Sequence, residues 1–258
     1  MGFLLYTMIM AIIRPTVLNI NKPLGWTSRD VLNKLQRLYN FKKFGHAGTL
    51  DPLATGVLLV LVSKETKNQQ YYMSLPKEYR VRIFFGIDSP TLDLEGPLST
   101  KPEKIAIDKT KIENYLKEHL GEQEQKVPLY SAVKVKGKTL YKSARKGEVI
   151  ESIPTKKVVL HNYKIEDFKD NLKPFNKRSL EELQEYKDKL EFLSEHLPYV
   201  DIWLKTGKGY YVRSLARDLG EYLGTRGVVG KLERTAVGDF RIEDSLTMDY
   251  FESRPDLV

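Results

Sequence analysis

The chain has 258 residues, a formal net charge of +8 and no cysteine. This length suits one large domain or two small ones, and 41% of hydrophobic residues is enough to build a buried core. The lack of cysteine excludes disulfides, thiolate nucleophiles, iron–sulfur clusters and cysteine zinc sites, and it fits a reducing compartment. The basic excess is compatible with a polyanionic partner, although a lysine-rich protein without such a partner would have the same charge.

The N-terminal stretch MGFLLYTMIMAIIRP is apolar, but the apolar run stops at Arg14 and is too short to span a bilayer. It also lacks the basic start and the small-residue cleavage site of a signal peptide. We therefore expect residues 1–14 to be an N-terminal extension, with Met8 and Met10 as alternative translation starts. We expect a cytoplasmic protein without membrane attachment.

In the first part of the chain, short strands alternate with one helix. Residues 17–21 (VLNIN) have the pattern of a strand, and Thr27 with Asp30 resembles the capping box that begins a helix. The run VLLVLV at 57–62 is short enough to be a buried strand. Residues 78–86 alternate apolar and charged side chains, which predicts a strand with one buried face.

The second part continues the same mixture. Asp108 is placed to cap a helix, and 130–147 reads as a strand, a glycine turn and a short helix. Residues 178–197 predict a charged amphipathic helix that looks like an insertion. A strand is expected at 199–206 and a helix at 213–223. The pattern predicts an α/β protein of the α+β type, with a mixed, mostly antiparallel sheet flanked by helices and loops.

The stretch GHAGTLDPLATG carries a single carboxylate, Asp51, directly before the buried run. Because a residue before proline is pushed out of the helical region, Pro52 favours an extended Asp51. Three glycines, at positions 45, 48 and 56, allow tight turns and a close approach by another backbone. A rigid loop that presents one carboxylate would explain the pattern, and so would an aspartate that accepts hydrogen bonds from its own turn.

Most familiar chemistries do not fit this stretch. His46 could be a base, a ligand or a packing group, but a zinc deaminase would need cysteines beside it. There is no G-x-S-x-G elbow and no P-loop ending in Gly-Lys-Ser/Thr. A glycosidase would need a second carboxylate, which Asp88, Asp93 or Glu95 could supply, but nothing in the sequence places them near Asp51. We expect no metal and no cofactor.

Five motifs in order, from about Asn19 to Phe240, resemble the TruB family of pseudouridine synthases. They are NKPLGWTS…KFGHAGTLDPLATGVLLV, EYRVRIFFG with DSPTLDLEG, VPLYSAVKVKGKTLYKSARKG, YYVRSLARDLGEYLG and KLERTAVGDF. This resemblance implies the pseudouridine synthase fold in one catalytic domain over 15–250, with the helix at 178–197 as an insertion. It implies an enzyme that isomerises the uridine at position 55 in the T loop of tRNA. The family's usual C-terminal RNA-binding domain, of the PUA type, is expected to be missing.

The resemblance also implies roles for individual residues. Asp51 matches the catalytic aspartate, Tyr79 the tyrosine that stacks on the target base and helps with proton removal, and Arg213 the arginine that pairs with the aspartate. The residues expected to bind the RNA substrate are His46, which would fill the space of the flipped base, Lys22, Gly45, Thr49, Tyr211 and Leu232. Without the resemblance, Tyr79 would read as a core residue, Arg213 as a surface arginine and Lys22 as a solvated turn lysine.

The implied chemistry is consistent with these residue types. Flipping a stacked base costs a few kcal/mol, and stacking on Tyr79 would return roughly 1–3 kcal/mol. Arg213 would keep Asp51 ionised, because an opposite charge lowers the pKa of an acid. The carboxylate could then attack the sugar carbon or remove a sugar proton, and both routes cleave the N-glycosidic bond without a cofactor. We expect a monomer that binds the T arm of tRNA and needs no protein partner.

Without the C-terminal RNA-binding domain, the RNA contacts are expected elsewhere, and one motif departs from the family pattern. RNA is expected to bind the lysine-rich stretch with the cations Lys134, Lys136, Lys138, Lys142, Arg145 and Lys146. Contacts of these cations with phosphates would make RNA binding depend strongly on salt. The usual Gly-Thr-Tyr before the arginine is Gly209-Tyr210-Tyr211. The alternatives to the main hypothesis are a pseudouridine synthase that acts on another RNA, and an RNA-folding chaperone that uses the same cleft.

Overall fold

The computed structural model describes residues 16–40, 43–100, 107–135, 137–148, 152–170, 172–175 and 183–254. The expected N-terminal extension at 1–14, with its alternative starts, lies outside the described residues, and so does Lys136. The chain forms two compact units: unit 1 consists of Met1–Lys77 and Glu233–Val258, and unit 2 of Glu78–Leu232. Within the described ranges, no helix is both long and apolar enough to cross a membrane.

Unit 1 is built on a small antiparallel sheet. Strand β1 (Val17–Lys22) pairs antiparallel with β3 (Ala54–Val62), and the short β2 (Phe44–His46) also pairs antiparallel with β3. The unit also holds the end of β12 (Gly227–Val237), which pairs with β13 (Phe240–Arg241). The apolar run predicted as a buried strand is confirmed. It forms the core of the unit together with neighbours from other segments, in the cluster Ala47, Val57, Leu59, Leu61 and Val237.

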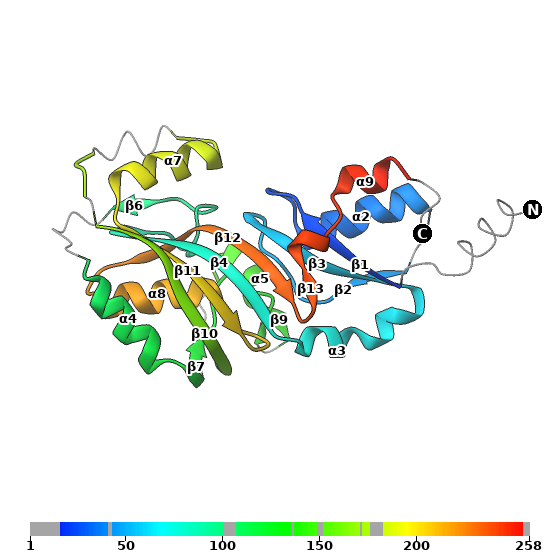
Figure 1. The fold of residues 1–258 in the computed structure, drawn as a ribbon, viewed down its shortest axis with the longest axis horizontal. Coiled ribbons are helices and arrows are strands. Elements are labelled where there is room, and N and C mark those ends of the chain that lie inside the picture. Colours follow the sequence, from blue (N-terminus) through cyan, green and yellow to red (C-terminus); the bar gives the residue numbers. More distant parts are fainter. Residues whose placement is uncertain are drawn as a thin grey trace, which may run out of the picture. The chain divides into compact units, whose positions relative to one another are not determined.

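Two helices of unit 1 lie side by side, as Figure 1 shows for α2 (Ser28–Tyr39) and α9 (Met248–Glu252). The predicted capping box is confirmed, with Thr27 as N-cap. The hydroxyl of Tyr39 donates to the carbonyl of Phe251 at 3.1 Å, which joins the end of α2 to α9. The remaining elements of unit 1 are η1 (Ser63–Asn68), α3 (Gln69–Ser74) and η2 (Ile242–Asp244).

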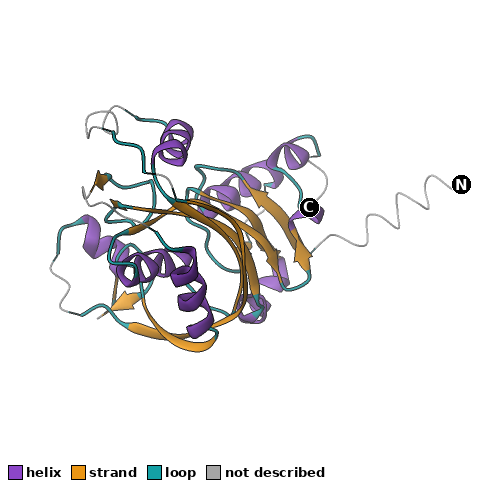
Figure 2. Cartoon of the chain, turned by 60° about the vertical axis from the view of Figure 1, so that its left-hand side comes forward, coloured by secondary structure: helices purple, strands orange, loops and turns teal. Residues whose placement is uncertain are grey.

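Unit 2 contains a larger, strongly curved sheet (Figure 2). Its strands β4 (Lys77–Phe85), β11 (Tyr199–Thr206), β10 (Thr155–Lys169) and β7 (Gly121–Lys126) are neighbours in that order. Strand β10 is antiparallel to both β11 and β7. The alternation predicted for β4 is confirmed, because Tyr79, Val81 and Ile83 are buried while Arg80 is exposed. The mixed α/β class with a mostly antiparallel sheet is therefore confirmed.

Helices α4 (Lys109–Glu118) and α8 (Val212–Tyr222) cover one face of this sheet (Figures 1 and 2). Asp108 caps α4 by accepting the N–H of Thr110 at 2.8 Å, as the sequence predicts. The predicted strand, glycine turn and short helix appear as the hairpin β8 (Lys134–Val135) and β9 (Lys138–Thr139), followed by α5 (Leu140–Arg145). A two-stranded sheet of β5 (Ile87–Asp88) and β6 (Ser99–Thr100) completes unit 2.

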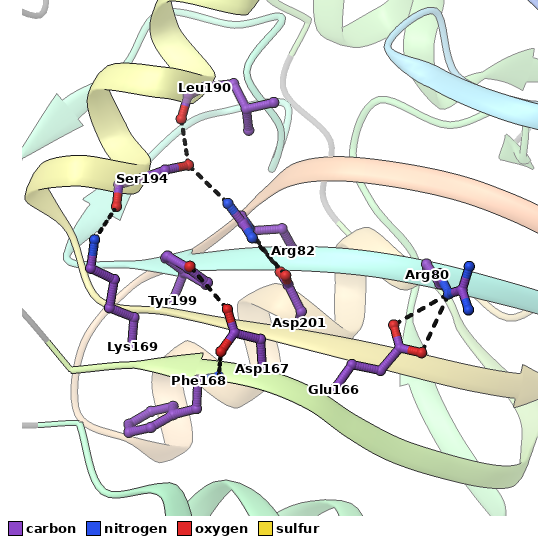
Figure 3. A network of polar contacts seen from close by, with 10 residues as sticks. All are labelled: Arg80, Arg82, Glu166, Asp167, Phe168, Lys169, Leu190, Ser194, Tyr199 and Asp201. Carbon is purple, nitrogen blue, oxygen red and sulfur yellow. Dashed lines mark hydrogen bonds and ion pairs between the residues drawn. The ribbon is translucent and has the colours of Figure 1, made fainter.

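Helix α7 (Tyr186–His196) is shorter than the helix predicted at 178–197. Glu185 is its N-cap with an extended backbone, so the helical pattern of the sequence does not continue backward through this residue, and 176–182 lie outside the described residues. Two hydroxyls hold α7 to the sheet: Tyr186 donates to the carbonyl of Gly230 at 2.8 Å, and Ser194 accepts from Arg82 at 3.0 Å (Figure 3).

Candidate functional site

In unit 1, five of the sequence-predicted residues come together around the loop between β2 and β3. Gly45 and His46 are in β2, Thr49 and the half-buried Asp51 lie in the loop, and Lys22 ends β1. The carbonyl of Asp51 accepts the N–H of Ala54 at 3.1 Å, which closes a turn at the start of β3. We call residues 47–53 the Asp51 loop.

Two glycines make the course of this loop feasible. Gly48 and Gly56 have φ angles of 94° and 97°, in the left-handed region that side chains other than glycine rarely adopt. At Gly56 a Cβ atom would lie 2.2 Å from the backbone oxygen of Arg234. The predicted need for a close backbone approach is therefore confirmed at this position.

Lys22 is fully buried, so its interpretation as a solvated turn lysine is wrong. Its ammonium group donates to the carbonyls of Pro23 at 2.8 Å and Pro52 at 3.2 Å, and also to that of Trp26. Burial lowers the pKa of Lys22 to about 8, while the nearby Asp51 carboxylate acts in the opposite direction. Lys22 thus ties the backbone beside Asp51 to β1, and it places a positive charge in the field of that carboxylate.

Arg234 is the residue of this site that sequence reasoning missed. Only 1% of it is exposed, and from β12 its Nε donates to the carbonyl of Val57 at 2.7 Å while Nη2 donates to that of Gly48 at 3.1 Å. A fully buried arginine is rare unless its donors are satisfied, and here they bind Gly48 in the Asp51 loop and Val57 in β3. The available signal was an arginine at an inward position of the alternating stretch KLERTAV.

The surroundings of His46 favour its neutral form. Burial lowers its pKa, and the cations Arg29 and Arg234 lower it further. Its carbonyl accepts from Gln69 at 2.7 Å, whereas its buried Nδ1 has no hydrogen-bond partner among the described residues. A neutral imidazole at the end of β2 suits contact with a base or sugar better than contact with a phosphate. No group of three His, Asp or Glu side chains that could hold a metal ion occurs in the described part of the chain.

Unit 2 carries the remaining predicted residues. Tyr79 in β4 and Leu232 in β12 are 8% and 9% exposed, respectively, so both side chains are covered. Tyr211 is the N-cap of α8 and is half-buried, and Arg213 lies in the first turn of the same helix. The structure thus places Tyr211 and Arg213 on one helix start, with Tyr79 and Leu232 on strands.

Arg213 is buried, which makes its interpretation as a surface arginine wrong. Its guanidinium donates to the carbonyls of Thr91 at 2.9 Å and Tyr130 at 3.0 Å, and it lies 3.9 Å from the carboxylate of Asp93. These contacts fix the arginine within unit 2 from two segments that are far apart in the sequence. Its pairing with Asp51 stays a prediction.

The unusual Tyr210 is part of the packing between α4 and α8. Its side chain is buried, and its pKa is raised chiefly by burial and further by Tyr115 and Asp218. Tyr115 belongs to α4 and Asp218 to α8. The phenol that replaces the usual threonine therefore lies within electrostatic reach of groups in α4 and α8.

The lysine-rich stretch forms an exposed basic surface on the β8–β9 hairpin and α5. Lys138 pairs with Glu148 at 3.3 Å, and the guanidinium of Arg145 lies 4.6 Å from the ring centre of Tyr141. The other exposed cations there are Lys134, Lys142 and Lys146. An aromatic ring among exposed cations is a typical arrangement for contacts with RNA.

Comparison with known proteins finds matches over most of the chain. A family model described as TruB family pseudouridylate synthase (N terminal domain) matches residues 36–183, and one described as tRNA pseudouridylate synthase B C-terminal domain matches residues 213–255. The chain is 35% identical over 237 residues to tRNA pseudouridine synthase B of Nostoc sp., which covers 92% of this chain and 72% of that relative. It is 38% identical to the enzyme of the same name from Opitutus terrae, over 93% of this chain and 88% of the relative.

Solved structures show the same fold. A chain in the crystal structure of a Cbf5-Nop10-Gar1 complex superposes with a TM-score of 0.63 at 24% identity, over 96% of this chain and 58% of that chain. A chain in the structure of an H/ACA RNP bound to a substrate RNA containing 2'-deoxyuridine gives a TM-score of 0.60 at 21% identity, over 97% of this chain and 58% of the other.

Proposed function

Because the chain belongs to the TruB family of pseudouridylate synthases, we propose that it converts the uridine at position 55, in the T loop of tRNA, to pseudouridine. We assign the catalytic carboxylate to Asp51. The observation that carries this proposal is the setting of Asp51, on a loop whose backbone is bound by the buried cations Lys22 and Arg234. A fixed carboxylate beside buried positive charge is what a nucleophile or base needs when no cofactor takes part.

In the proposed reaction, the carboxylate of Asp51 attacks the sugar carbon C1′ or removes a proton from the sugar. Either route breaks the bond between C1′ and N1 of the uracil. The base then turns within the closed site and a bond forms between C1′ and C5. In the first route this releases the carboxylate from C1′, and in the second the abstracted proton returns to the sugar. Finally the proton leaves C5 while N1 gains one. Atoms and charge balance, as an isomerisation requires. Lys22 supports the proposal, because its positive charge lies in the field of the carboxylate that both routes use.

The remaining residues take roles around the flipped base. We propose that Tyr79 stacks on the base and assists removal of the C5 proton, and that Arg213 pairs with the carboxylate of Asp51. Neutral His46 would fill the space from which the base has left. The exposed cations of the β8–β9 hairpin and α5 would bind phosphates of the T arm.

The test is a single modification assay. An unmodified tRNA transcript is incubated with the purified protein, and pseudouridine is mapped by carbodiimide labelling and reverse-transcription stops. The wild type should produce one new stop at position 55, which should be absent with Asp51→Asn and with a transcript that carries cytidine at that position. The variant should unfold at the same temperature as the wild type and bind tRNA with the same Kd.

Four results would overturn parts of the proposal. A stop at another uridine would reject the T-loop position, and an unchanged stop with Asp51→Asn would reject the catalytic role of that residue. Product on ribosomal RNA but not on tRNA would support the alternative substrate. Accelerated tRNA refolding without any product would support an RNA-folding chaperone.

A further inference from the structure

The hydroxyl of Ser28 holds both backbone groups of the residue that precedes Asp51. Ser28 is the first residue of α2 and is 2% exposed. Its Oγ accepts the N–H of Leu50 at 2.9 Å and donates to the carbonyl of Leu50 at 3.3 Å. These are the two hydrogen bonds that a neighbouring strand would otherwise supply, and here one side chain provides both.

The backbone on the other side of Asp51 is held by the same segment of the chain. The carbonyl of Pro52 accepts from the N–H of Gly25 at 2.9 Å and from Lys22 at 3.2 Å. Lys22, Gly25 and Ser28 lie within seven consecutive residues of unit 1. Asp51 therefore lies between two residues whose backbone groups are fixed by hydrogen bonds. At Leu50, among the described contacts, Ser28 supplies both of these bonds.

We propose that Ser28 is a positioning residue for the catalytic carboxylate: it sets the direction of the peptide group from which Asp51 projects. A reacting group has to lie within a few tenths of an ångström of its productive place, and a misplacement of about 1 Å can cost about 100-fold in rate. Ser28 does not touch the substrate in this assignment. Its effect should fall on the chemical step and leave the affinity for RNA unchanged.

The neighbouring hydroxyl of Thr27 provides a matched control. Thr27 is exposed, and among the described residues its side chain bonds only within the helix start, to Asp30. Thr27→Ala therefore removes a helix cap without touching the Asp51 loop, and it should reduce stability while leaving the basal activity unchanged. Ser28→Ala removes the contact with Leu50 and keeps Thr27 and its cap.

The experiment measures single-turnover kinetics on a tRNA transcript with wild type, Ser28→Ala, Ser28→Cys and Thr27→Ala. We expect Ser28→Ala to lower the rate of the chemical step at least tenfold with KM and the Kd for tRNA within twofold. Thr27→Ala should keep the wild-type rate even if its unfolding temperature falls by more than that of Ser28→Ala. Ser28→Cys, which keeps a weak donor and acceptor, should recover part of the rate.

This inference rests on the proposed function, and the design separates the two. Absence of pseudouridine with the wild type would reject the proposed function. Product with the wild type and an unchanged rate with Ser28→Ala would reject the positioning role. If Ser28→Ala does not fold, Ser28→Cys decides, because a wild-type rate in that variant rejects the role and a reduced rate at unchanged Kd supports it. A crystal structure of the variant should show a displaced Asp51 carboxylate, and an unmoved Asp51 loop would also reject the proposal.

Discussion

The side-chain amide of Gln125 forms hydrogen bonds with both backbone groups of Tyr211. Nε2 donates to the carbonyl at 3.0 Å, and Oε1 accepts the N–H at 2.8 Å. Gln125 is 3% exposed and belongs to the edge strand β7, whereas Tyr211 starts the helix that carries Arg213. A single side chain thus fixes the place at which α8 begins.

Replacing this amide should loosen the helix start. Gln125→Leu keeps the size of the side chain but leaves the N–H and C=O of Tyr211 without their partner, and a buried unpaired polar group costs about 1–3 kcal/mol. We expect an unfolding free energy lower by that amount, measured in urea, together with reduced turnover on tRNA. Gln123→Leu, in the same strand, loses one bond to the carbonyl of His119 and should cost less than about 1 kcal/mol. Equal losses in the two variants would contradict this account.

Lys22 should make stability depend on pH in a definite direction. Its pKa is lowered from 10.5 to about 8 in the folded protein, so the unfolded chain binds more protons between these two values. The unfolding free energy should therefore rise with pH across that window, by up to about 3 kcal/mol for this one group. Urea titrations near pH 7.5 and near pH 9.5 measure the rise, and Lys22→Met should remove part of it. The pKa of Lys77 is also lowered to about 8, so Lys77 should account for a comparable part of the rise in unfolding free energy with pH.

The same titration should reduce activity. The ammonium group of Lys22 uses three donors on three carbonyls, and a neutral amine has only two. The hydrogen bond to Pro52 is the longest of the three. It should therefore be the first to be lost when Lys22 becomes neutral above about pH 8. We expect single-turnover rates to fall as pH rises through about 8, in spite of the gain in stability. A rate that is constant from pH 7 to pH 9.5 would show that this contact does not matter for the reaction.

Gly56 should tolerate no side chain. Alanine there would combine a φ angle of 97° with a Cβ atom 2.2 Å from the backbone oxygen of Arg234, so the strands would have to separate. We expect Gly56→Ala to lose more than about 3 kcal/mol or to fail to fold. Gly25→Ala is the comparison, because its φ is 79° and no atom of the described residues lies within 4 Å of the added Cβ. Its cost should stay at about 1–2 kcal/mol. Thermal unfolding of the two variants gives the answer.

Two arginines of β4 should differ sharply in their contribution to stability (Figure 3). Arg82 makes a two-pronged pair with Asp201 at 2.7 and 2.6 Å and lies 3.8 Å from the ring centre of Tyr199. Arg80 makes one pair with Glu166 at 3.3 Å, and 60% of its side chain is exposed. We expect Arg82→Met to cost about 1–3 kcal/mol and Arg80→Met less than about 0.5 kcal/mol.

Hydrogen exchange of backbone amides gives a second comparison of the variants Arg82→Met and Arg80→Met. Because Arg82 also donates to Ser194 of α7, amides of this helix should exchange faster in Arg82→Met than in the wild type. In Arg80→Met they should be unchanged. Faster exchange of α7 in both variants, or in neither, would show that Arg82 does not anchor the helix.

Several parts of the fold could be predicted because their cause is local. The box of Thr27 and Asp30 begins α2, since capping depends on residues three apart. The alternation in β4 predicts its buried face, since side chains of a strand alternate between its two faces. Gly48 and Gly56, before and after Asp51, mark a loop with tight turns, since glycine readily adopts the positive φ angles that such turns need. The roles of Asp51, Tyr79 and Arg213, in contrast, came from the resemblance to a family, and they remain proposals.

Strand β10 could not be found from its pattern. Its pairing with β11 shifts register twice, between Leu160 and Asn162 and between Ile165 and Asp167. Each irregularity changes which side chains face the core, so the period of two that identifies a strand is broken within the strand itself. The helical pattern also predicts a start for α7 that is too early, because charged residues continue that pattern into Glu185, whose backbone is extended.

The amino-acid sequence determined which loop carries the lone carboxylate and which short segments become helices and strands, because these depend on neighbours a few residues away. Only the tertiary structure decided that Lys22, Arg213 and Arg234 are buried. A charged side chain can be buried only where carbonyl or carboxylate groups satisfy it. These partners come from distant positions in the sequence, as when Arg234 donates to the carbonyl of Gly48. No local pattern records such partners, so the electrostatic setting of Asp51 emerges only when the chain has folded.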